Sequence, residues 1–135
     1  MGCHILIKLI CGRSRAGKTT YSKQFDNVIH LDFCSTYPSQ YESALKKVEK
    51  QQGDVIIEGI YNTAERRTAL LESYKGDGKR VCIWLDTPLD IIESRFFNSK
   101  AYKLPHPFEP PTYSEGWDEI IIIRGEHEQS SSNEK

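Results

Sequence analysis

Cysteine pairs with the spacing of a metal site or a redox motif are absent from this sequence. Its four cysteines stand singly, without a C-x-x-C pair, and they are Cys3, Cys11, Cys34 and Cys82. Two of them, Cys11 and Cys82, fall in apolar runs that predict buried strands. This usage argues against a disulfide framework or a zinc site, and it favours reduced thiols and a cytoplasmic location.

A hydrophobic run long enough to cross a membrane is also missing, and so is a secretory signal. The chain carries 18 basic and 19 acidic residues, for a formal net charge of −1. It therefore has no general positive field to attract nucleic acid or a membrane surface, and we expect no membrane partner. The composition indicates no oligomeric state.

The basic residues are nevertheless unevenly distributed. No acidic residue precedes Asp26, although five basic residues do: Lys8, Arg13, Arg15, Lys18 and Lys23. A second stretch without an acid, residues 95–106, holds Arg95, Lys100 and Lys103. Two local basic patches on a nearly neutral chain predict a phosphate site rather than a nucleic-acid coat.

Apolar runs alternate with helix-like segments along the chain. Strands are predicted at residues 5–11, 27–33, 54–59, 80–86 and 118–125. Helices are predicted at residues 18–25, 37–52 and 63–74, and from Thr87 as N-cap and Pro88 in the first turn. This alternation predicts an α/β fold with a five-stranded parallel sheet covered by helices on both faces. We expect one domain over residues 1–125, a proline-rich loop at 103–116 and a disordered polar tail at 126–135.

The segment from Gly12 to Thr19 has the pattern G-x-x-x-x-G-K-T between a predicted strand and a predicted helix. Its two glycines let the backbone curl so that N–H groups point at an anion. In such a loop Lys18 reaches the β- and γ-phosphates and the Thr19 hydroxyl binds Mg²⁺. We therefore expect ATP and Mg²⁺ as cofactors, with ATP bound by Gly12, Arg13, Ser14, Arg15, Ala16, Gly17, Lys18, Thr19 and Thr20.

Two carboxylates follow predicted strands, and parallel sheets bind ligands at the carboxyl ends of their strands. Asp32 ends the second strand and Glu58 ends the third. We favour Asp32 as the general base that takes the proton of an attacking hydroxyl, and Glu58 as a residue that orders Mg²⁺-bound water. The reverse assignment stays open, because Asp32 also suits a turn and Glu58 also suits a partner for a nearby arginine.

The sequence narrows the class of nucleotide-binding protein. It contains neither the D-x-x-G nor the N-K-x-D string of GTPases, and Gly59 rather than a second acid follows Glu58, unlike large ATPase motors. A small kinase remains, in which the protein positions the phosphates and an acceptor hydroxyl. Arg95, with Lys100 and Lys103, would then lie in a closing lid or on an ordinary helix end. Arg66 and Arg67 would face the acceptor or form salt bridges.

Three stretches resemble the polynucleotide 5′-kinases of phage and of DNA-repair kinase–phosphatases. They are "GKTTYSKQF", then "DVIIEGIYNTAERR", and then "FEPPTYSEGWDEIII", with Asp32 between the first two. The resemblance covers residues 5–124 and implies the strand order 2-3-1-4-5. Phe33 to Thr36 follow Asp32, where that family often has an arginine.

The resemblance implies roles for individual residues. It makes Lys18, Asp32 and Arg95 catalytic, with Arg95 on the ATP phosphates, and it makes Thr19 and Glu58 metal residues. The substrate side comprises Asp32, Glu58, Asn62, Arg66 and Arg67. The expected activity is ATP-dependent phosphorylation of a hydroxyl, in the first place the 5′-OH end of DNA or RNA. A kinase acting on nucleosides, nucleotides or small molecules, and a non-catalytic ATP-binding regulator, are the alternatives.

Overall fold

The computed structural model describes residues 6–13, 16–31, 38–51, 53–74, 76–88, 90–92, 108–124 and 128–131. Its strands are β1 (Ile7–Gly12), β2 (Ile29–His30), β3 (Val55–Glu58), β4 (Arg80–Leu85), β5 (Glu119–Arg124) and β6 (Glu128–Ser131). Its helices are α1 (Lys18–Ser22), α2 (Pro38–Lys50), α3 (Ala64–Ser73) and the short 3₁₀ helix η1 (Tyr113–Glu115). Residues 90–92 are also helical.

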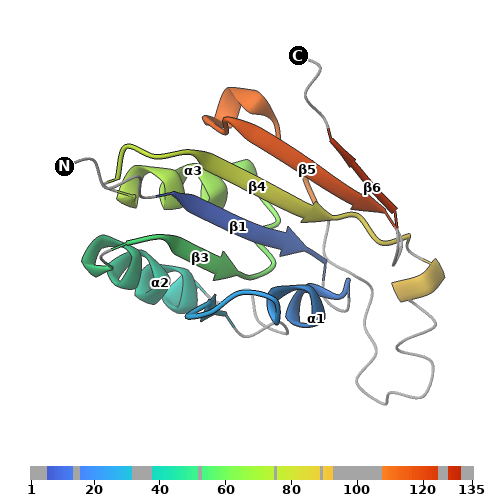
Figure 1. Cartoon of the computed structure of the whole chain (residues 1–135), viewed down its shortest axis with the longest axis horizontal. Helices are drawn as coiled ribbons and strands as arrows, with labels where there is room; N and C mark the ends of the chain where they lie inside the picture. The colour runs from blue at the N-terminus through green and yellow to red at the C-terminus, as the bar shows by residue number, and fades with distance from the viewer. Residues whose placement is uncertain are drawn as a thin grey trace.

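The strands form one sheet in the order β2-β3-β1-β4-β5-β6 (Figure 1). The first five pair in parallel, which confirms the predicted order 2-3-1-4-5. β6 pairs antiparallel with β5. The prediction of a disordered tail is therefore wrong for residues 128–131, because backbone pairing on the open edge of β5 needs no apolar side chain. Residues 125–127 and 132–135 of that tail lie outside the described residues.

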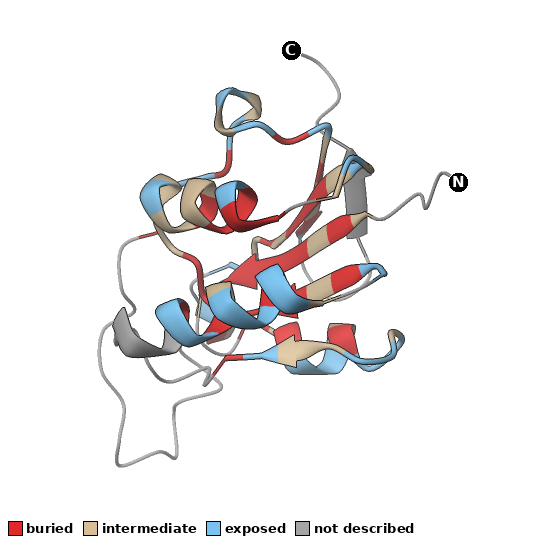
Figure 2. Ribbon diagram, turned by 90° about the vertical axis from the view of Figure 1, so that its left-hand side faces the viewer, coloured by how far each residue is buried: buried red, intermediate tan, exposed pale blue. Residues whose placement is uncertain are grey.

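Alternate residues of the strands build two cores. One face of the sheet packs on α2 and α3 and buries, among others, Leu9, Ile57 and Leu70. The opposite face, covered by the α1 segment, buries Ile10, Ile83 and Leu85 with Ala16, and Tyr21 and Phe25 pack against them. Figure 2 shows buried residues concentrated in the strands and exposed residues on the outer sides of the helices. Helices thus cover both faces, as the apolar strands predict.

Several elements are shorter than their sequence patterns suggest. β2 has two residues because it lies at the sheet edge and pairs only with β3. α1 ends at Ser22, and a turn through Asn27, whose φ is +56°, leads into β2. In the described part of the chain, no helix is both long and apolar enough to cross a membrane.

Candidate active site

The phosphate-loop pattern lies where β1 ends and α1 begins, at the carboxyl edge of the sheet (Figure 1). Gly17 precedes the helix with a φ of +101°, a left-handed conformation that favours glycine. At Gly12, an added Cβ would lie 2.8 Å from the Leu85 carbonyl oxygen of β4. Both glycines are therefore required by the backbone that they build.

Lys18 folds back over this loop. Its side chain is buried, and its Nζ donates a hydrogen bond to the Arg13 carbonyl at 2.7 Å. The Ala16 N–H donates to the same carbonyl at 3.0 Å. The ammonium thus sits inside the curl of the loop, as the motif requires, while Thr19 and Thr20 are exposed at the start of α1.

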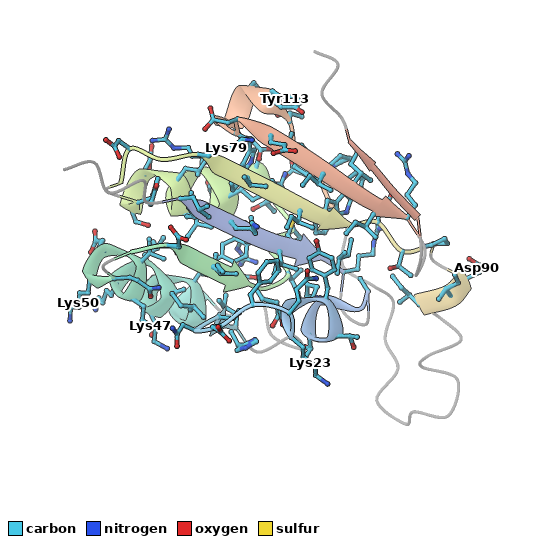
Figure 3. All side chains as sticks on the ribbon, viewed as in Figure 1. Lys23, Lys47, Lys50, Lys79, Asp90 and Tyr113 are labelled. Atoms are coloured by element: carbon cyan, nitrogen blue, oxygen red, sulfur yellow. The ribbon has the colours of Figure 1, made fainter. Side chains whose placement is uncertain are left out.

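The end of β4 supports the loop from outside the motif. The Thr87 hydroxyl is buried and donates to the Ala16 carbonyl at 2.7 Å. We predicted Thr87 as a helix N-cap. In the structure, its side-chain hydroxyl forms a hydrogen bond to the phosphate loop. Asp90, a few residues further on, lies at the same end of the sheet as α1 (Figure 3).

Glu58 lies on the same face of the sheet as α1. Ile56 packs in the cluster with Ile10 and Tyr21, and Glu58, two residues later in β3, points to that face as well. Its side chain is buried, and Oε1 accepts a hydrogen bond from His30 Nδ1 at 2.5 Å. Its other oxygen, Oε2, is buried without a hydrogen-bond partner among the described residues.

This carboxylate fits the expected cation site in one respect. A buried carboxylate oxygen without a donor is costly unless a cation or its bound water completes the site. The prediction that an arginine pairs with Glu58 finds no support, because its described partner is His30. No cluster of three or more His, Cys, Asp or Glu side chains that could hold a metal ion occurs within the described ranges.

Asn62 and Arg66 meet on the other face of the sheet. Arg66 Nη1 donates to Asn62 Oδ1 at 3.1 Å, and its guanidinium carbon lies 4.2 Å from the ring centre of Tyr41. Tyr41 belongs to the core between α2, α3 and the sheet. These two predicted substrate residues are therefore brought together, and both are only partly buried.

Comparison with known proteins adds to this geometry. No protein-family model and no curated protein matches the sequence. A chain from the PezAT chromosomal toxin–antitoxin system of Streptococcus pneumoniae matches with a TM-score of 0.55 and 17% identity, over 98% of this chain and 72% of that chain. This likeness and the parallel strand order 2-3-1-4-5 are consistent with the fold of the P-loop kinases. At this identity the likeness concerns the fold alone, so the polynucleotide kinase resemblance is confirmed only to that level.

Within this fold, Arg67 is enclosed by other parts of the protein. It is fully buried and forms a two-point pair with Glu115, from Nε to Oε1 at 2.8 Å and from Nη2 to Oε2 at 3.0 Å. Its Nη1 donates to the Tyr61 carbonyl at 2.7 Å. The predicted substrate role of Arg67 is wrong, because its guanidinium is enclosed and committed to these groups; the salt-bridge alternative is correct.

The segment 108–117 is the partner of Arg67, and we name it the strap. Glu115 also accepts from Trp117 Nε1 at 3.0 Å, and the Glu109 N–H donates to the Asn62 carbonyl at 2.9 Å. Phe108 stacks on Trp84, with ring centres 5.8 Å apart, and lies 5.9 Å from the Arg13 guanidinium carbon. These contacts explain residues of the "FEPPTYSEG" pattern by hydrogen bonding and ring stacking within the protein.

The remaining predicted site residues lie outside the described residues. They are Ser14 and Arg15 of the loop, Asp32, and the lid residues Arg95, Lys100 and Lys103. Sequence reasoning also missed His30, because it did not align the second and third strands. Once β2 and β3 are known to pair, their register sets His30 directly opposite Glu58.

Proposed function

We propose that this chain is an ATP-dependent phosphotransferase that moves the γ-phosphate to a hydroxyl group. One observation carries the proposal: a glycine-bounded loop encloses the Lys18 ammonium at the end of β1, and the neighbouring strand β3 ends in a buried carboxylate with an oxygen that has no partner among the described residues. The P-loop kinase fold supports it. A general base such as Asp32 and a basic lid would have no purpose in a passive nucleotide binder.

Different groups of the phosphate loop would bind the phosphates and the Mg²⁺ of the nucleotide. The backbone N–H groups between Gly12 and Gly17 would bind the phosphates, and Lys18 would exchange its bond to the Arg13 carbonyl for phosphate oxygens. Thr19 and Glu58 would hold Mg²⁺, directly or through water. When bound, Mg²⁺ neutralises charge on the phosphate oxygens.

Asp32 remains our proposed general base. It follows β2 by two residues in the sequence, and the acceptor hydroxyl would approach at the carboxyl edge of the sheet. Glu58 suits that role less well, because His30 occupies one of its oxygens and its side chain is buried. Arg95 remains our proposed lid arginine for the transferring phosphate.

The 5′-OH end of DNA or RNA is the first acceptor that we propose, on the resemblance of the three stretches to polynucleotide 5′-kinases, chiefly that of the segment from Phe108 to Ile120. Asn62 and Arg66 would contact it. The second candidate is a kinase for nucleosides, nucleotides or small alcohols. One observation favours it: the strap, whose sequence supports the nucleic-acid resemblance, binds Arg67 through Glu115 and so has a structural role.

A transfer screen tests the proposal. ATP labelled on the γ-phosphate is incubated with 5′-OH oligonucleotides, nucleosides, nucleotides and small alcohols, with Lys18→Ala as the matched control. Label on oligonucleotides supports the first acceptor, and label on small molecules alone supports the second. ATP binding with no acceptor labelled would contradict the proposed transfer and leave a regulatory binder.

A further inference from the structure

His30 and Glu58 form a hydrogen-bonded pair across the first two strands of the sheet. They face each other in the parallel register of β2 and β3, and the Leu31 N–H donates to the Glu58 carbonyl at 2.9 Å. Because an ionised carboxylate only accepts hydrogen bonds, the proton lies on His30 Nδ1. The His30 side chain is about half exposed (53%), whereas that of Glu58 is 2% exposed.

This hydrogen bond occupies one carboxylate oxygen of Glu58 and leaves the other available. Oε1 is held toward the edge strand, and Oε2 has no partner among the described residues. With Oε1 fixed, the carboxylate plane is fixed too, and so is the position of Oε2. A pair that served only the stability of the sheet edge would satisfy both oxygens, or apolar side chains would replace it.

We propose that His30 is a positioning residue: it orients Glu58 so that Oε2 is presented to the Mg²⁺ that accompanies the nucleotide. The inference rests on the proposed function, because it assigns that cation to this site. His30 itself sits on the edge strand, with β3 between it and β1, so it acts through Glu58. Partners that orient a ligating carboxylate typically change metal affinity 10–100-fold when they are removed.

Two substitutions of His30 test separately the hydrogen-bond donor and the volume of the imidazole ring. His30→Phe keeps the ring volume and removes the hydrogen-bond donor. His30→Asn removes the ring and keeps a donor nitrogen at the position of Nδ1. Lys79→Ala is the matched control, because it breaks another side-chain ion pair, with Glu119 at 2.9 Å, at the end of β4 away from the phosphate loop (Figure 3).

The measurement is binding of a non-hydrolysable ATP analogue at increasing Mg²⁺ concentration. We expect His30→Phe to raise the Mg²⁺ concentration for half-maximal enhancement by about 10-fold or more, with little change in metal-free nucleotide affinity. His30→Asn should return it close to the parental value, and Lys79→Ala should leave it unchanged.

The outcomes distinguish this inference from the proposed function. If the parent shows Mg²⁺-enhanced nucleotide binding and folded His30→Phe shows the same curve, the positioning role is wrong and the proposed function stands. If the parent shows no Mg²⁺-dependent binding, both are contradicted. If His30→Phe does not fold, His30→Asn is the deciding variant. A Mg²⁺ titration of nucleotide binding like that of the parent supports the positioning role. A half-maximal Mg²⁺ concentration raised about tenfold contradicts the argument that the hydrogen-bond donor orients Glu58.

Discussion

At the scale of single residues, we propose different roles for the two strand-end acids. Glu58 is enclosed, with one oxygen bonded to His30 and the other without a partner in the described part of the chain. A carboxylate in that setting is suited to a cation that stays in place through the reaction. Asp32 follows the short edge strand β2 by two residues in the sequence, and parallel sheets bind ligands at the carboxyl ends of their strands. We therefore keep Asp32 as base and Glu58 as metal residue.

Substitution of each acid by its amide tests this assignment. Asp32→Asn keeps the shape but cannot take a proton, so we predict that phosphoryl transfer falls about 10²-fold or more while ATP and Mg²⁺ binding survive. Glu58→Gln should instead shift the midpoint of the Mg²⁺ titration. Single-turnover transfer, ATP affinity and Mg²⁺ dependence are measured on both. Parental transfer by Asp32→Asn would reject the base assignment.

Residues whose role follows from the backbone were predictable from the sequence. Gly12, Gly17 and Lys18 are such cases, because the loop allows few other residue types there. His30 and Thr87 were not, because their partners lie 28 and 71 residues away along the chain. Such contacts depend on strand order and register, which a single sequence leaves open.

At the scale of elements, the strap and α3 form one unit. Arg67 lies three and four residues before Leu70 and Leu71, which places all three on the buried side of the helix. This spacing is the signal that separates Arg67 from its more exposed neighbour Arg66. Burial is the largest single influence and lowers the pKa of Arg67, but the hydrogen bonds that Arg67 donates to Glu115, together with the Coulombic attraction of nearby groups, outweigh it and raise the pKa of Arg67 above its usual value. The pair is therefore fully charged in the interior.

Removing one member of this pair should be costly. Arg67→Ala leaves Glu115 buried and uncompensated, and we predict a loss of about 3–5 kcal/mol in the free energy of unfolding. Arg66→Ala, one residue earlier and partly exposed, should cost less than about 1 kcal/mol. Urea denaturation of both variants and the parent is the measurement. Equal losses in the two would mean that the strap is not anchored through Arg67.

At the scale of the whole molecule, five apolar strands alternating with helices were enough to predict the parallel sheet. β6 was not predictable, because its sequence EQSS has no apolar residue to signal a strand, and backbone pairing does not need one. The interior also carries titratable groups that its apolar surroundings keep neutral. Burial raises the pKa of Tyr41, Tyr61 and Cys82 above their ordinary values of 10.0, 10.0 and 9.0.

These groups predict that stability falls in alkaline solution. Above about pH 9 the unfolded chain releases protons that the native state keeps, so the free energy of unfolding decreases as pH rises. Below that value the contribution is fully present. Urea denaturation between about pH 8 and pH 10.5 measures the slope. Tyr61→Phe should make the decline shallower at little cost near neutral pH, because its hydroxyl has no partner among the described residues; an unchanged slope would contradict its burial.

The central claim, that the loop from Gly12 to Thr19 holds ATP for phosphoryl transfer, is tested most directly by one comparison. Single-turnover transfer of labelled γ-phosphate is measured with Mg²⁺ for the parent and for Lys18→Ala, on the acceptor that the screen identifies. The account predicts transfer by the parent and a fall of about 10²-fold or more in the variant, because its ammonium is the side-chain cation enclosed by the loop. Transfer by Lys18→Ala at the parental rate, or a parent that neither binds ATP nor transfers its phosphate, would contradict it.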